Sequence, residues 1–170
     1  MKRLLERAIL TFLFVLLVAG RLLLAQNPQP SKTKVAAIQV EMIQSDEIKL
    51  PAEFKIALYE NLIRQLGKEG FFPLYRDGDT RAAGMADLVV LHSTVNKFKE
   101  GSERARQVTT FAGATSITIH CKFTKSDGDV LLERDVNGKV RFFGGNLRAT
   151  HDFAKKAAHL TSQNFTISSK

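Results

Sequence analysis

Residues 116–123 read SITIHCKF, and their strict alternation of apolar and polar side chains decides the fold. Ile117, Ile119, Cys121 and Phe123 share one face of a strand, while hydroxyl, imidazole and amine side chains share the other. A strand with one apolar face belongs to a sheet that packs its core on one side and meets water on the other. The stretch therefore predicts a sheet covered only on its Cys121 face.

Four further strands are expected around this one. They cover residues 34–42, 71–75, 87–97 and 130–143, and the central strand itself extends over 108–124. Pro73 places its strand at a sheet edge, because proline cannot donate a ladder hydrogen bond. Gly113 predicts a bulge or a close backbone approach. We interpret 130–143 as one strand and not as a hairpin at Asn137-Gly138, because its apolar residues keep a period of two across the glycine.

Two helices complete the pattern. Residues 51–66 repeat apolar side chains at four-residue steps and start with a proline that suits a first helical turn. Glu60 and Arg64 are spaced for an i,i+4 ion pair. The second helix covers 147–165. The order strand, helix, four strands, helix predicts a two-layer α+β sandwich, a mostly antiparallel sheet of about five strands with both helices on one face. The 34–42 strand is expected in the same sheet.

The N-terminal residues 1–25 have the three-part layout of a secretory signal peptide. Their uncharged run, Ala8 to Gly20, is shorter than the roughly 20 apolar residues of a membrane-spanning helix. We expect cleavage between Ala25 and Gln26. We expect the cleaved product to be periplasmic or extracellular.

A retained inner-membrane anchor is the alternative, because Arg21 lies near the end of the apolar segment and could snorkel to the interface. After the signal peptide, residues 26–33 are interpreted as a linker and residues 34–168 as a single α+β domain. No second linker and no repeat follows in the sequence.

The net charge is formally +8 at pH 7, and removing residues 1–25 lowers it to +5. The remaining charges of both signs are interspersed, which is typical of a solvated surface and not of a nucleic-acid-binding stripe. One local excess comprises Lys97, Lys99, Arg104 and Arg106 at a hairpin tip. These four are a candidate contact surface for anionic lipid headgroups, an acidic glycan or an acidic protein. The alternative is a solvated tip that blocks edge pairing.

No residue set in the sequence points to catalysis or to a cofactor. The motifs HExxH, GxSxG, GxGxxG and the Walker lysine loop do not occur. Cys121 falls on the apolar face, so a buried and inert thiol is expected. His92 and His120 lie on strands expected to be neighbours, but two histidines without a third ligand make a poor metal site. We therefore predict no catalytic, cofactor-binding or metal-binding residue.

Two Asp-Gly-Asp runs, at residues 77–79 and 127–129, resemble fragments of calcium loops. Both lack the further acidic ligands and the terminal glutamate of such a loop. Turn chemistry explains them better, because aspartate and glycine favour tight turns.

Several segments together resemble a family of exported bacterial proteins. They are ADLVV at 86–90, FAGATSITIHCKF at 111–123, SDGDVLLERDVNGKV at 126–140 and LYENLIRQLGKEGFFPLY at 58–75, followed by a Gly-Gly pair and an alanine-rich helix. The family is domain of unknown function 4410, and the resemblance covers residues 34–168. It implies an exported domain without assigned catalytic residues. Common members carry a lipobox cysteine, which this chain lacks, so no lipid anchor is expected.

The element order is also similar to small α/β domains of envelope proteins. These are the curli-secretion pore protein, the activator lipoprotein of penicillin-binding proteins and the amino-terminal domain of the Tol translocation protein. Those domains bind other envelope proteins, and the likeness concerns fold alone.

The leading hypothesis is a non-enzymatic domain of the cell envelope that binds another protein through an exposed sheet edge. One alternative is a small hydrolase or ligand-binding domain that uses the polar sheet face around His92 and His120. The other is a membrane-tethered structural subunit whose N-terminal anchor stays uncleaved. Neither a nucleic acid nor a small-molecule ligand is expected as a partner.

Overall fold

Two sheets and two long helices form the domain in the computed structural model, which describes residues 31–102, 104–105, 113–140 and 145–168. The main sheet has the strand order β3-β2-β4-β5-β6. Its strands are β2 (Ala37–Val40), β3 (Leu74–Arg76), β4 (Leu88–Lys99), β5 (Thr115–Lys125) and β6 (Val130–Val140). The second sheet joins β1 (Thr33–Val35) to β7 (Phe165–Ile167) in parallel.

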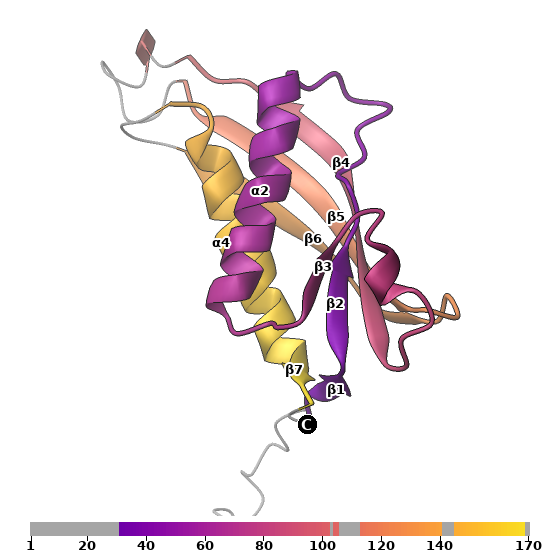
Figure 1. Cartoon of the computed structure of the whole chain (residues 1–170). Coiled ribbons are helices and arrows are strands. Elements are labelled where there is room, and N and C mark those ends of the chain that lie inside the picture. The colour runs from indigo at the N-terminus through magenta and orange to yellow at the C-terminus, as the bar shows by residue number, and fades with distance from the viewer. Residues whose placement is uncertain (1–30, 103, 106–112, 141–144, 169–170) are drawn as a thin grey trace, which may run out of the picture. The chain divides into compact units, whose positions relative to one another are not determined.

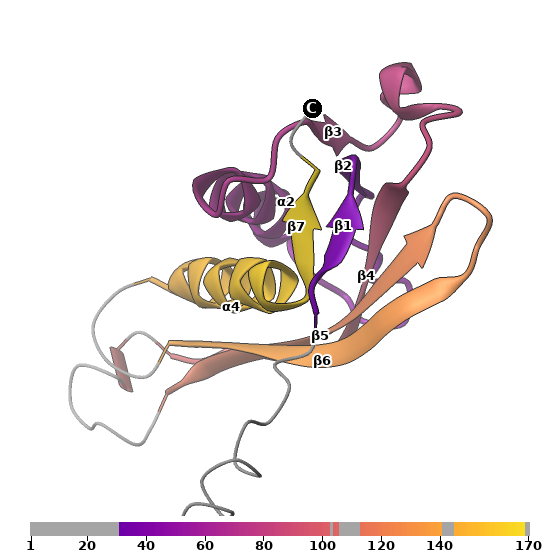
Figure 2. The same ribbon diagram turned by 90° about the horizontal axis from the view of Figure 1, so that it is seen from below.

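Both long helices, α2 (Ala52–Lys68) and α4 (Arg148–Asn164), lie on the same face of the main sheet (Figure 1). Seen from below, the sheet curves around them, with β5 and β6 beneath α4 and with β2 and β3 on the side of α2 (Figure 2). The predicted α+β class, with helices on one face only, is confirmed.

The sheet is mixed, because two kinds of connection build it. The strand-helix-strand unit β2-α2-β3 makes its two strands parallel, as a helical crossover requires, and β4 also runs parallel to β2. Strands β4, β5 and β6 follow one another as an antiparallel meander with far longer pairings. Strand β3 lies at an edge, as Pro73 predicted.

The expected first strand, residues 34–42, divides in two. Its second part, β2, joins the main sheet as predicted, whereas its first part, β1, pairs with β7. The sequence predicts a last helix that includes Phe165, but this residue begins β7, which directly follows Asn164 without a turn signal. The part of the predicted 108–124 strand before Gly113 lies outside the described residues.

Alternation along the strands places the core between sheet and helices. Strand β5 buries all its odd-numbered residues from Thr115 to Phe123. Aromatic contacts extend this layer, since the Phe123 ring lies 5.2 Å from that of Phe165, and the Phe54 ring of α2 lies 5.0 Å from that of Phe98 on β4. Each buried aliphatic or aromatic side chain here stabilises the fold by about 1.5–3 kcal/mol.

The buried Tyr59 connects α2 to the β2 and β3 strands. Its hydroxyl donates to the Val40 carbonyl at 3.2 Å and accepts from the Asp77 amide at 2.8 Å. Burial raises the pKa of this phenol above its ordinary value. The group therefore stays protonated and keeps both hydrogen bonds at neutral pH.

Glu60 does not pair with Arg64 as the helical spacing suggested. Its two carboxylate oxygens accept from the guanidinium of Arg76 at 2.6 and 2.9 Å. The planar fork of Arg76 supplies two parallel donors, a geometry that outcompetes a single helical contact. The pair lowers the pKa of Glu60, but both side chains are exposed, so its contribution to stability stays below about 1 kcal/mol.

Helix α4 lies unusually close to β6 at Gly138. A Cβ atom built on Gly138 would meet the Ala149 carbonyl and would stand 2.7 Å from Cβ of Phe153. Strand β6 also runs unbroken through Asn137 and Gly138, which confirms the single strand predicted there. The glycine therefore serves helix packing and not a turn.

Gly101 shows a second close approach, because a Cβ on it would meet the Gly113 carbonyl. This confirms the predicted backbone approach at Gly113. Within the described residues, no helix combines the length and the apolar character needed to span a bilayer.

Replacing Gly138 with alanine is expected to lower the unfolding free energy by about 1–3 kcal/mol, because the added methyl group overpacks the α4 interface. The matched control is Gly67→Ala in α2, where the new methyl would meet only the tip of the exposed Phe72 ring. That change should be neutral or stabilising by up to about 1 kcal/mol. Urea unfolding measures both, and equal effects would contradict the close-packing explanation.

Candidate protein-contact site

The face of the sheet that points away from the helices is polar along β4, β5 and β6. The register of the strands aligns the side chains of this face into rows that run across β4, β5 and β6. His92 lies opposite Lys122, Thr94 opposite His120, and His120 opposite Asp135. We call this surface the outer face.

His92 is held between two strands. Its Nδ1 lies 2.6 Å from Oε2 of Glu41, just beyond β2, and its Nε2 lies 3.0 Å from Oγ1 of Thr124 on β5. Both ring nitrogens are therefore engaged by protein groups.

His120 makes a separate pair one row further along. Its Nδ1 lies 2.9 Å from Oδ1 of Asp135 on β6, and the Asn96 side-chain amide donates to the same oxygen at 3.4 Å. The two histidines are on neighbouring strands, as predicted, but they are diagonal neighbours in the register. Such diagonal positions are about 7–8 Å apart, and each imidazole turns to its own carboxylate.

The two histidines therefore do not converge on a common site. No three histidine, cysteine or carboxylate groups of the described residues gather in a way that would bind a metal. A groove of about 370 Å³ lies at the start of β4, where Lys34, Asp87 and Asp127 line it. His92 and His120 do not line this groove, so it gives no support to a ligand site around them.

Cys121 is fully buried on the helix side of β5. Burial raises the pKa of its thiol to about 12. The Ser93 hydroxyl faces the thiol across the β4–β5 pair and lowers its pKa by less than burial raises it. A neutral buried thiol cannot act as a nucleophile.

Strand β6 is the long free edge of the main sheet, and α4 covers one half of it. Asp152 Oδ2 accepts from the Lys139 amide at 2.8 Å, and Lys156 Nζ donates to the Asn137 carbonyl at 3.0 Å. Asp152 and Lys156 are themselves an ion pair at 2.7 Å. Two edge groups that would otherwise be open to a foreign strand are thus satisfied within the chain.

The other half of the β6 edge is open. Residues two apart on a strand direct their backbone N–H and C=O groups to the same side. The backbone groups of Glu133 and Asp135 therefore point away from β5, like those of Asn137 and Lys139. No hydrogen bond to the outward amides or carbonyls of Glu133 and Asp135 is found among the described residues. We call residues 133–135 the open edge.

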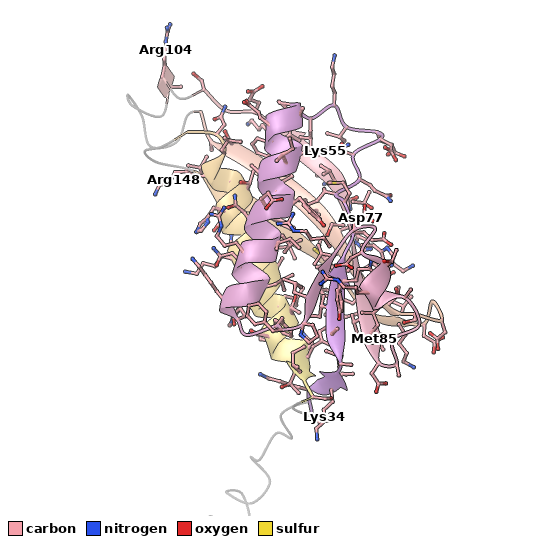
Figure 3. The ribbon with its side chains drawn as sticks, viewed as in Figure 1. Lys34, Lys55, Asp77, Met85, Arg104 and Arg148 are labelled. Carbon is pink, nitrogen blue, oxygen red and sulfur yellow. The ribbon has the colours of Figure 1, made fainter. Side chains whose placement is uncertain are left out.

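The predicted basic surface at the β4–β5 tip is present in part. Lys97 and Lys99 are exposed on β4, and Arg104 is exposed at the far end of the domain (Figure 3). Arg106 lies outside the described residues, as do Ala25 and Gln26 of the expected cleavage point. Lys139 of β6 lies on the same face as Lys97 and Lys99, one strand away across β5.

The Asp-Gly-Asp runs are turns, as predicted. Gly78 and Gly128 have φ angles of +72° and +92°, a region that favours glycine. The Asp127 carboxylate accepts from the Asp129 amide at 3.0 Å, and Asp79 accepts from the Arg81 amide at 3.1 Å.

Comparison with solved structures shows what the fold is similar to. PelC of Paraburkholderia phytofirmans, a dodecamer, matches with a TM-score of 0.60 and 11% identity over 81% of this chain and 94% of that chain. A variant of the same protein in another crystal form gives 0.57 and 12% over 80% and 92%. A Xanthomonas campestris protein of family 330 of unknown function gives 0.46 and 15% over 80% and 85%. The PelC likeness shows a shared fold at low identity.

No protein-family model matches the chain, and no curated protein matches it. The resemblance to family 4410 therefore stays a prediction.

Cys121 should resist thiol reagents in the folded protein at pH 8 and react fully in concentrated guanidinium. The unfolded thiol titrates near pH 8.5, so above that pH only the unfolded chain releases its proton. Up to the folded pKa of about 12, this group alone lowers the unfolding free energy by about 1.4 kcal/mol per pH unit. A Cys121→Ala, Lys155→Cys variant is the labelling control, and fast labelling of the native wild type would contradict burial.

Removing the Asp152 carboxylate should open the covered half of the β6 edge. In Asp152→Ala, the Lys139 amide loses an acceptor worth about 1.5 kcal/mol, so its hydrogen exchange should accelerate about tenfold. Light scattering should also show more self-association. Lys155→Ala is the control on the same helix, and unchanged Lys139 exchange in Asp152→Ala would refute the covering role.

Proposed function

We propose that the chain is an exported, non-enzymatic domain of the cell envelope that binds another protein through the open edge of β6. The observation that carries this proposal is the unequal treatment of one strand edge. Asp152 and Lys156 cover Asn137 and Lys139, whereas the outward backbone groups of Glu133 and Asp135 stay uncovered. Proteins usually protect a long sheet edge along its whole length. An edge that is protected in only one half is therefore suited to pair with a partner strand along the other half.

The open edge has the chemistry of a strand acceptor. A partner strand would pair with the outward amides and carbonyls of Glu133 and Asp135. Their side chains are already directed to the outer face, where Glu133 pairs with Lys122 at 3.3 Å and Asp135 with His120. Only the backbone is therefore left for the partner, together with the exposed side chain of Arg134.

A second candidate function is assembly with further copies of this chain. The likeness to PelC, which is a dodecamer, favours it. Two β6 edges would pair badly with each other, however. An antiparallel pairing centred on Arg134 would place Arg134 opposite its copy and Glu133 opposite Asp135, and like charges directly opposite each other destabilise a strand pair. A different surface of the second copy is needed.

Export rests on the signal-like residues 1–25. The intact mass of the protein isolated from the envelope fraction decides between cleavage after Ala25 and a retained anchor. Recovery of the uncleaved protein from the cytoplasm alone would contradict an envelope function.

Replacing Glu133 with proline removes an outward amide without touching the ladder to β5, because the Glu133 backbone faces away from that strand. Crosslinking in cells from a photoreactive residue at position 134 should capture a partner in the wild type and lose it in Glu133→Pro. The matched control is Glu133→Ala, which removes the same side chain but keeps the amide.

Equal crosslinking in the proline and alanine variants would rule out strand pairing at this edge. Loss in both variants would assign the effect to the Glu133 carboxylate. Thermal unfolding of each variant verifies that the fold is retained.

A further inference from the structure

Three lysines form a patch at one end of the outer face. Lys97 and Lys99 point outward because Phe98 between them packs inward on Phe54. Lys139 points outward because Gly138 before it faces α4. We call these three residues the lysine patch.

The strand register places the patch on β4 and β6, the two strands on either side of β5. Lys99 and Lys139 both lie opposite Ser116, so one strand separates them. With about 4.8 Å between strands, their Cα atoms are about 10 Å apart. The charges are therefore close enough to act together on one anionic segment.

The patch differs from the rest of the outer face because its cations have no anionic partner. Further along the same strands, Lys122 pairs with Glu133 and His120 with Asp135. Lys97, Lys99 and Lys139 form no ion pair in the described part of the chain, although all three are exposed. Three like charges on one sheet face repel one another, so the arrangement suits an acidic partner from outside.

An acidic segment of matching size lies elsewhere on this chain. The connection from β2 to α2 carries Asp46 and Glu47, and the first turn of α2 adds Glu53; all three are exposed and form no ion pair with any described residue. Lys49 is the single cation among them, so residues 45–53 have a net charge of −2. We call these three carboxylates the acidic connection.

Both surfaces lie at the same end of the domain. The Gln44 amide donates to the Ser93 carbonyl and the Val95 amide donates to the Gln44 carbonyl, both at 2.9 Å, so the chain beyond Gln44 runs beside β4 toward its end. The connection then crosses to the start of α2 at the top of the view (Figure 1). Arg104 marks the same end and Lys34 the opposite end (Figure 3).

The acidic connection lies to one side of the lysine patch, because it flanks β4, and the patch extends from Lys97 and Lys99 on β4 toward β6. The acidic connection flanks β4 on the β2 side, whereas Lys139 lies on β6, beyond β5. If two copies are related by a rotation about an axis parallel to the strands, the end of the domain that carries the patch stays at the same height in both copies. The same rotation brings the β2 side of one copy against the β6 side of the next. Such a contact uses two different surfaces, and it repeats into a ring when the rotation closes.

We infer that a second copy of this chain docks its acidic connection on the lysine patch, in a head-to-tail assembly. This inference deepens the proposed function, on which it rests, by naming the partner of the β6 side. It also supplies the different surface that the like charges of two facing β6 edges require.

Charge reversal in two separate variants tests the inference. Lys139→Glu and Glu47→Lys each place like charges in the contact, so each protein isolated from expressing cells should be monomeric by native mass spectrometry. The wild type should be oligomeric at about 0.05 M salt and dissociate near 0.5 M, because salt screens the contact. An equimolar mixture of the two variants should reassemble, since each then offers the surface that the other lacks.

The mixture also controls for folding, because misfolded variants would not reassemble. Lys34→Glu makes the same charge change at the opposite end and should leave the wild-type mass unchanged. Retention of the wild-type mass by either reversal variant, a mixture that stays monomeric, or a wild type that is monomeric at low salt would each overturn the inference. The proposed function would still stand if the Glu133→Pro and Glu133→Ala crosslinks differed.

Discussion

The close approach of α4 to β6 at Gly138 is the constraint on which the other features depend. Only a residue without a side chain lets the Ala149 carbonyl and Phe153 come so near to the strand. The facing residues of α4 are mostly alanine and threonine, which allow the same short separation along the helix. Helix α4 therefore lies over the edge strand, and its polar side chains reach around it.

Covering of the β6 edge follows from this position of the helix. Asp152 and Lys156 stand one turn apart and reach the Lys139 amide and the Asn137 carbonyl. With a wider helix–strand separation, the same ion pair would form on the helix surface and leave the edge bare. The covering ends where the strand passes beyond the reach of these two side chains, and the open edge begins there.

The sequence predicted which side chains face the core better than it predicted which residues contact one another. Alternation in residues 116–123 correctly buried Cys121 and exposed His120, because it depends on local geometry alone. The partners of the polar residues depend on register and on parallel pairing, which alternation does not specify. Glu41 meets His92 through the parallel β2–β4 pair, and Glu60 meets Arg76 across a helix-strand contact, so both pairs were missed. Asp152 and Lys156 have i,i+4 spacing, but spacing alone does not show that they reach β6, because that depends on where the helix lies.

The interspersed charges of the sequence suggested a surface on which both signs are evenly distributed. In the folded chain the charges are distributed unevenly. Charges along the middle of the outer face find partners across the strands, as Lys122 and Glu133 do. At the end of the same face the three lysines form no ion pair with a described residue, while Asp46 and Glu47 lie in the connection that flanks β4 on its β2 side. An isolated molecule gains nothing from keeping complementary charges apart, since bringing them together would relieve repulsion on both sides. Their separation becomes favourable when one copy meets another, because each copy then supplies the charge that its neighbour lacks.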